Sequence, residues 1–106
     1  MAYMYSVSFD IPRDRMDELM IGAALERVLG YLRALLPSEV GFTAVRALRS
    51  VDGDGPVGLL VESVWQTWED LARHRASSLS EDKVLQEFEP HVELSDLTAH
   101  VYQEVD

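Results

Sequence analysis

The chain has 106 residues, of which 47% are hydrophobic and 26% are charged, a balance typical of one globular domain spanning residues 1–106. Nineteen acidic residues against nine basic residues give a formal charge of −10, which disfavours nucleic acid and anionic membrane surfaces as partners. The absence of cysteine excludes disulfides and thiolate metal sites, and no apolar run approaches the roughly 18 residues that would span a membrane.

The first part of the chain predicts a strand, a helix and a second strand. Apolar and polar residues alternate over Tyr3–Phe9, which is the two-residue period of a strand with one apolar face. Apolar residues then recur at three- and four-residue intervals over Met16–Leu35, the spacing of an amphipathic helix that ends before Pro37. A β-rich run follows over Val40–Val51.

The second part of the chain predicts a hairpin, two helices and a last strand. The two Asp-Gly steps within Asp52–Pro56 indicate a turn, so Val57–Trp65 should pair with the preceding strand. Thr67, followed three residues later by Asp70, is typical of a helix N-cap with capping-box character. The remaining predicted elements are a helix, a shorter helix and a strand: Thr67–Leu79, Ser80–Glu89 and Leu97–Val105.

This order predicts an α+β domain of the ferredoxin-like βαββαβ type, a four-stranded antiparallel sheet with its helices on one face. The other face of such a sheet is uncovered. The strand Val57–Trp65 nevertheless carries apolar residues on both sides, with Leu59 and Val61 on one and Leu60 and Val64 on the other. Because monomers rarely expose an apolar sheet, we expect a homodimer joined through the uncovered sheet face.

One stretch of the sequence, Leu60–Ser78, carries a specific spacing. Trp65 ends a strand, a capped acidic turn opens the next helix, His74 follows nine residues after the tryptophan, and Ser77 supplies a small hydroxyl side chain. This spacing resembles the antibiotic-biosynthesis-monooxygenase-like family of dimeric α/β-barrel proteins. The resemblance implies a homodimer whose two sheets close into a barrel, with any pocket for a small molecule between each sheet and its own helices.

The family resemblance also carries expectations about chemistry. Its enzymes oxidise aromatic or quinol-like compounds with dioxygen and no added cofactor, or open haem. In the oxidising members an asparagine from the sheet is usually important, assisted by Trp or His, and this chain has no asparagine. The haem-opening branch has tryptophan where His74 stands here and histidine where Val84 stands, so haem chemistry is disfavoured.

Trp65 and His74 each have a structural and a functional interpretation. Trp65 either fills the core under the helix or stacks against an aromatic ligand. His74 lies one helical step from Leu71 and can face the sheet, where its near-neutral pKa would suit proton transfer from a phenol or quinol. The structural alternative for His74 is a hydrogen bond to a neighbouring strand or to a partner chain, because an isolated histidine has no orienting group.

Three further residues are candidates on the predicted sheet. His100 and Tyr102 share a strand face with Thr98, and this face either lines a cavity, where the imidazole serves acid-base chemistry and the phenol serves recognition, or forms a hydrated dimer seam. Arg46 is either an anchor for a carboxylate or enolate or an ion-pair partner of Glu62.

Two functions follow from these residues. The first is a small cytoplasmic homodimer resembling cofactor-independent monooxygenases that act on aromatic or polyketide-like molecules, with His74 or His100 handling the proton and Trp65, Arg46 and Tyr102 binding substrate. The second is a non-catalytic dimer that binds a small molecule or a protein. A filled space between sheet and helices would favour the second, and an open pocket at Trp65 and His74 the first. We expect no metal or cofactor, because the histidines lack ligand spacing and no phosphate-binding motif is present.

Overall fold

The computed structural model describes residues 1–94 and 97–105. The elements follow the predicted order, with a short 3-10 turn after the first helix. In chain order they are β1 (Tyr3–Ile11), α1 (Glu18–Leu35), η1 (Leu36–Ser38), β2 (Phe42–Arg49), β3 (Val57–Trp65), α2 (Trp68–Ser77), α3 (Leu79–Phe88) and β4 (Thr98–Gln103). The α+β ferredoxin-like prediction is therefore confirmed, and the helical segment after β3 consists of two helices, as the sequence predicted.

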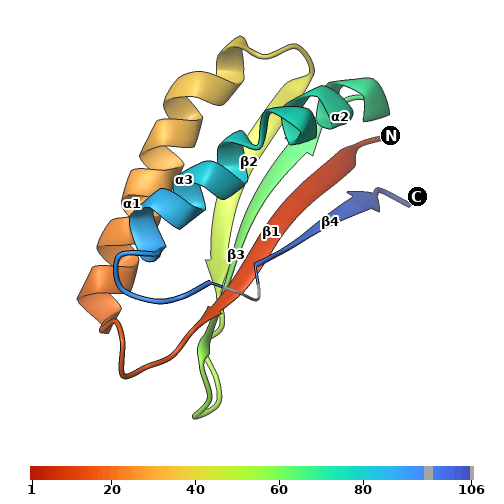
Figure 1. Ribbon diagram of the computed structural model, residues 1–106. Helices are drawn as coiled ribbons and strands as arrows, with labels where there is room; N and C mark the ends of the chain where they lie inside the picture. Colours follow the sequence, from red (N-terminus) through yellow and green to blue (C-terminus); the bar gives the residue numbers. More distant parts are fainter. Residues whose placement is uncertain (95–96, 106) are drawn as a thin grey trace.

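The four strands form one antiparallel sheet in the order β2-β3-β1-β4 (Figure 1). β1 pairs with β3 along its whole length, from Tyr3 opposite Trp65 to Ile11 opposite Val57. β4 pairs with the other edge of β1, with Ser6 opposite His100. Because side chains alternate between the faces of a strand, these registers fix which residues share a face of the sheet.

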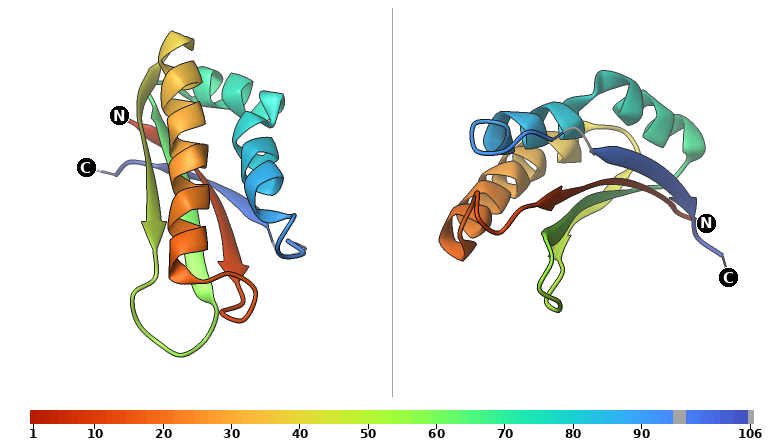
Figure 2. Two further views of the ribbon diagram at one scale, coloured as in Figure 1. Left: turned by 90° about the vertical axis from the view of Figure 1, so that its left-hand side faces the viewer. Right: turned by 60° about the horizontal axis from the view of Figure 1, so that its bottom comes forward.

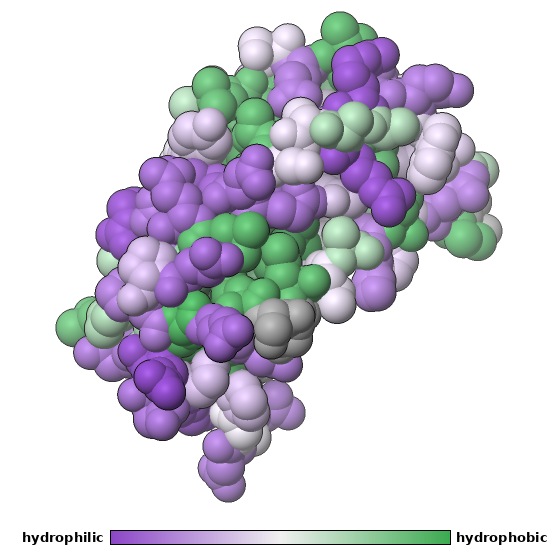
Figure 3. All heavy atoms as spheres, in the orientation of Figure 1, coloured by the Kyte–Doolittle hydropathy of each residue, from purple (hydrophilic) through white to green (hydrophobic). Residues whose placement is uncertain are grey.

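All the helices described lie on one side of the sheet (Figure 2). α1 and α3 pack against each other over it, and their inward stripes bury Ile21, Val28 and Leu32 from α1 and Val84 and Phe88 from α3. The view in Figure 3 faces this layer, and hydrophilic side chains cover much of its outer surface. The opposite face of the sheet has no helix from the described part of the chain, as the sequence predicted.

Several predicted boundaries were wrong by a few residues. β1 continues past Phe9 to Ile11, because Ile11 is fully buried and pairs with Val57. α1 begins at Glu18 rather than Met16, because the Asp17 side chain accepts a hydrogen bond from Met20 N at 2.8 Å and so caps the helix.

The ends of other elements also differ from prediction. β2 is Phe42–Arg49 rather than Val40–Val51, since Gly41 takes a positive φ of 84° just before it. α3 runs over Leu79–Phe88, one residue earlier than predicted, after Ser78 in the left-handed region. β4 is Thr98–Gln103, shorter at both ends than the predicted Leu97–Val105.

Candidate functional site

The five residues singled out in the sequence fall on opposite faces of the sheet. Trp65 and the helical His74 lie in the layer between sheet and helices, and both are buried, at 0% and 1% exposure. Arg46 and His100 lie on the uncovered face, in one row across the sheet through Glu62 and Ser6. Tyr102 lies on the same face, one row away, opposite Met4. The structure therefore brings Trp65 and His74 together and separates them from the other three.

Trp65 is held at the end of β3 by contacts on several sides. Its ring stacks on the His74 imidazole with centroids 4.7 Å apart and an interplanar angle of 25°. Its indole Nε1 donates a hydrogen bond to Ser63 Oγ at 2.9 Å, which satisfies the one polar atom of the side chain. The Phe42 ring packs edge-on against it at 5.7 Å. These contacts are those of a core tryptophan whose free ring face is occupied by an imidazole.

His74 is the titratable group at the centre of this layer. Its Nε2 is hydrogen-bonded to Ser80 Oγ at 3.0 Å, and its Nδ1 is buried without a hydrogen-bond partner, 3.7 Å from Glu39 Oε1. Burial lowers the pKa of His74 from 6.5 to about 4. The imidazole is therefore neutral near neutral pH, and a base of such low pKa holds an abstracted proton weakly.

Two further titratable groups lie close to His74. Tyr5, on β1, packs edge-on against the imidazole at 5.8 Å and donates its hydroxyl to Glu81 Oε1. Glu81 Oε2 is buried without a partner, and burial raises the pKa of this carboxyl. Sequence reasoning missed Glu39, Ser80 and Glu81. Tyr5 alone was indicated by the sequence, because the alternation of apolar and polar residues in its strand predicts that it lies on the apolar face.

The space between sheet and helices is filled by side chains in the part of the chain described. Val7, Leu71 and Phe88, like Trp65, have no exposed surface. Two of the hollows formed by the described residues lie elsewhere, and neither is lined by Trp65 or His74. The smaller, of about 190 Å³, lies over the helices beside Tyr31 and Lys83. Of the two arrangements that the sequence left open around Trp65 and His74, the described residues therefore show the filled one.

A polar row crosses the middle of the uncovered face. Arg46 Nε donates to Glu62 Oε1 at 2.6 Å, so the ion pair that the sequence offered as an alternative is present. Glu62 is only 6% exposed. Three strand spacings separate the backbones of Arg46 and His100, a distance of about 14 Å, so the two side chains do not contact each other within a subunit. The rings of His100 and Tyr102 are neighbours, 6.3 Å apart.

The larger hollow, of about 430 Å³, opens on this uncovered face. We call it the sheet hollow; its lining residues are Ser8, Phe9, Asp10, Leu48, Arg49, Ser50, Gly58, Leu59, Leu60 and Thr98. Hydroxyl groups of Ser8 and Thr98, 2.8 Å apart, form one side of it. Leu48 and Leu60, opposite each other on β2 and β3, supply apolar surface.

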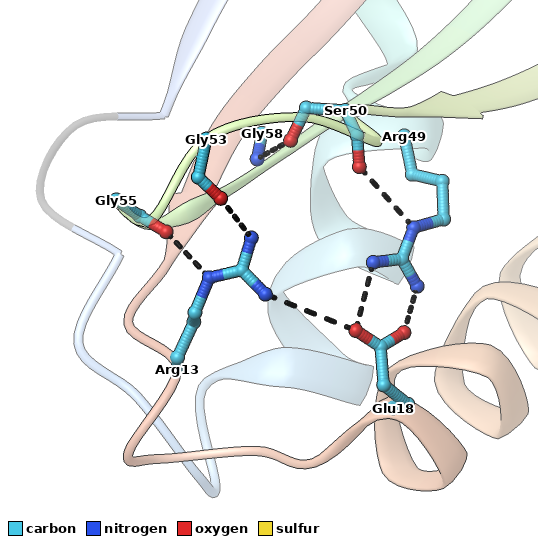
Figure 4. Close-up of polar contacts among 7 residues, drawn as sticks. All are labelled: Arg13, Glu18, Arg49, Ser50, Gly53, Gly55 and Gly58. Carbon is cyan, nitrogen blue, oxygen red and sulfur yellow. Dashed lines mark hydrogen bonds and ion pairs between the residues drawn. The ribbon is translucent and has the colours of Figure 1, made fainter.

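A cluster of charged groups joins the β2–β3 turn to the start of α1 (Figure 4). Glu18, at the start of α1, binds Arg49 through two hydrogen bonds and lies 4.0 Å from Arg13. Arg13 also donates to the carbonyls of Gly55 at 2.7 Å and Gly53 at 3.2 Å in the hairpin turn. The turn between β2 and β3 is thus tied to the chain that enters α1, and the guanidinium of Arg49 is already paired.

Metal and membrane sites are not found among residues 1–94 and 97–105. No group of three or more His, Cys, Asp or Glu side chains there is placed to hold a metal ion. Within the same residues, no helix combines the length and apolar character needed to cross a membrane.

No protein-family model and no curated protein sequence matches the chain. Solved structures do match its fold. A proposed antibiotic biosynthesis monooxygenase from Bacillus cereus has a TM-score of 0.68 and 16% identity, covering 97% of this chain and 90% of that one. A variant of SnoaB, a cofactor-independent oxygenase from Streptomyces nogalater, has a TM-score of 0.65 and 16% identity, with 99% and 94% covered.

A third structural neighbour is described as a dimeric protein of unknown function with a ferredoxin-like fold, from Bacteroides fragilis. Its TM-score is 0.63 and its identity 9%, with 96% of each chain covered. The resemblance to monooxygenase-like proteins is therefore confirmed at the level of the fold. Since one fold supports many unrelated functions, identities this low do not transfer an activity.

Proposed function

We propose that this protein is a homodimer, joined through its uncovered sheet face, that binds a small aromatic molecule without oxidising it. The observation that carries the proposal is the position of the free space. The layer containing Trp65 and His74 is filled, whereas the sheet hollow of about 430 Å³ lies on the uncovered face and falls within the size range of small-molecule sites.

The composition of the uncovered face supports dimerisation. On either side of the polar row lie Val64 and Met4 in one row and Leu48 and Leu60 in the other. Such rows gain stability when a second sheet covers them, and two-fold symmetry allows the same face to serve both subunits. The Bacteroides fragilis neighbour is itself described as dimeric.

Dimerisation is tested by sedimentation velocity at micromolar concentration. Wild type should sediment at twice the monomer mass, and Leu60→Glu should sediment as a monomer because it places a charge in an apolar row of the covered face. Leu19→Glu, at a helix position 84% exposed, is the matched control and should remain dimeric. A monomeric wild type, or a dimer unaffected by Leu60→Glu, contradicts the proposed interface.

Ligand binding is tested by calorimetric titration with hydroquinone, a naphthoquinol and anthrone as probes. Gly58 lines the sheet hollow, and a Cβ there would meet its neighbours only at 3.5 Å or more, so Gly58→Leu should fill the hollow without a backbone clash. We expect this variant to weaken probe binding by on the order of tenfold. Gly22→Leu, with nothing within 4 Å, is the control. Equal affinity in all three proteins would refute the site.

A second function, cofactor-independent oxygenation, is favoured by one specific observation. Buried polar atoms without partners are rare, and His74 Nδ1 is one, in a ring stacked on Trp65. SnoaB, of the same fold, is described as a cofactor-independent oxygenase. For this function, a substrate would displace side chains beside Trp65 and His74 and give its proton to His74 Nδ1. Dioxygen would then oxidise the resulting carbanion or phenolate.

An oxygen electrode distinguishes the two functions. Oxidation of anthrone to anthraquinone consumes one dioxygen and releases one water. The oxygenase function predicts uptake above the spontaneous rate that is lost in both His74→Gln and Trp65→Phe. The binding function predicts uptake at the spontaneous rate in wild type and in both variants.

A further inference from the structure

The His74 imidazole is enclosed by four side chains, and they differ in their access to solvent. Trp65 covers one ring face, Tyr5 packs edge-on, and Ser80 binds Nε2. These three residues are 3% exposed or less. The fourth, Glu39, lies 3.7 Å from Nδ1, and its side chain is 29% exposed. Among the described neighbours of the ring, Glu39 is therefore the one that reaches both the imidazole and water.

The backbone that carries Glu39 is fixed on both sides. Glu39 N donates to Leu36 O at 2.9 Å, and Glu39 O accepts from Phe42 N at 3.3 Å. Two residues later, Gly41 O accepts from Gln66 N at 2.9 Å. Gly41 also has a positive φ of 84° and lies so close to the Asp70 carboxylate that an added Cβ would collide with it. A movement at this point thus involves the Glu39 side chain and not the loop.

We propose that the Glu39 side chain is a gate over His74, and that its rotation about its own side-chain bonds opens Nδ1 to solvent and to small reactants. Rotation of a partly exposed side chain needs no change in the helices or the sheet. It would turn a fully enclosed imidazole into one that a molecule entering between η1 and α2 can reach. The proposal is independent of ligand binding in the sheet hollow.

The charges around Glu39 support an outward movement. Burial raises the pKa of Glu39, so the closed position costs its ionised form solvation, while the charge of Arg73 on α2 acts in the opposite direction on that pKa. Arg73 is itself exposed and bound to Asp70 at 3.1 Å. Among the described residues, the neutral His74 is a further titratable group that faces Glu39. The ionised Glu39 carboxylate therefore gains hydration when it moves away from the His74 imidazole, and it stays near Arg73 on the surface.

Chemical modification tests the gate without any assumption about activity. Diethyl pyrocarbonate transfers one ethoxycarbonyl group to a neutral imidazole nitrogen and releases ethanol and carbon dioxide. Peptide mass spectrometry measures the rate at each histidine separately. His91, which is exposed beyond α3, serves as the internal reference in the same sample. In wild type, His74 should react far more slowly than His91.

The variants at position 39 give opposite expectations. Glu39→Ala removes the gate and should raise the His74 rate relative to His91 by on the order of tenfold or more. Glu39→Gln keeps the size of the side chain and should leave His74 protected to within about threefold of wild type. Glu69→Ala, which removes an exposed carboxylate from α2, should have no effect. Thermal melts establish that each variant is folded, and Glu39→Ser carries the same prediction as alanine if the alanine variant is not.

Two results would overturn the proposal. One is a folded Glu39→Ala or Glu39→Ser protein in which His74 remains as protected as in wild type, which would mean that other groups close the route. The other is an equal rise in Glu69→Ala, which would mean that modification follows general loosening of α2. Neither of these modification results depends on whether the probes bind in the sheet hollow, so the gate and the proposed function can fail separately.

Discussion

The free energy of unfolding should fall at acidic pH because His74 is buried as a neutral imidazole in the folded protein. Its side chain is 0% exposed, and its pKa is lowered from 6.5 to about 4 by desolvation. As the pH falls, the unfolded chain binds a proton on this imidazole before the folded protein does. The stability that the neutral ring contributes is therefore present above about pH 6.5 and is lost between about pH 6.5 and pH 4.

The size of this effect follows from the two pKa values. The interval from 6.5 to about 4, at about 1.4 kcal/mol per pH unit, corresponds to about 3 kcal/mol for the full transition. By the same linkage relation, about 2 kcal/mol of it should be lost on going from about pH 7.5 to about pH 5. A loss of this size is a substantial fraction of the stability of a small domain.

Urea unfolding of wild type and His74→Gln measures this loss of stability. Both proteins are compared at one concentration, because the stability of the proposed dimer would depend on concentration. Glutamine can bind Ser80 without titrating. Burial raises the pKa of Glu39 and Glu81, so these carboxyls act in the opposite direction and favour folding as the pH falls, but they are common to both proteins. Wild type should lose about 2 kcal/mol more than the variant between the two pH values. Equal losses would refute the claim that His74 is neutral and desolvated in the folded protein.

Three further predictions concern stability and local order. Gly41→Ala should cost about 1–3 kcal/mol more than Gly53→Ala in urea unfolding: both glycines have a φ of 84°, but only at position 41 would the Cβ strike Asp70. Thr67→Ala should cost about 1 kcal/mol, because Thr67 Oγ1 accepts from Asp70 N at 3.1 Å and caps α2, and a loss under a few tenths would contradict that role. Arg13→Ala should speed amide exchange in the turn 50–56 while leaving exchange in α2 unchanged, and uniform acceleration would argue against a local clamp.

The architecture was predictable because local patterns and turn chemistry agree. The alternation in Tyr3–Phe9 and the Asp-Gly steps before Val57 each indicate one local structure, and only a short list of topologies joins elements in this order. Boundaries were less predictable. β1 extends to Ile11 because a tertiary contact with Val57 decides where it ends, and no local pattern reports that contact.

The candidate site was only partly predictable. The sequence placed Trp65 and His74 nine residues apart, and the strand-to-helix connection then brings their rings into contact. It offered His74 and His100 as alternative proton acceptors, but only the sheet register shows that they lie on opposite faces. Glu39 and Glu81 carried no signal, because their positions beside the imidazole and Tyr5 depend on how η1 and α3 pack on the sheet.

The edges of the sheet bear on how the protein avoids aggregation. The order β2-β3-β1-β4 leaves β2 and β4 each with one unpaired side, and such edges can recruit further strands into open-ended fibres. β2 has an irregular register between Phe42 and Ala44 and carries Arg46 and Arg49, while β4 is only six residues long. Bulges, charges and short length all oppose strand addition. These features oppose growth by strand pairing, and the dimer proposed through the uncovered sheet face would itself stop at two subunits.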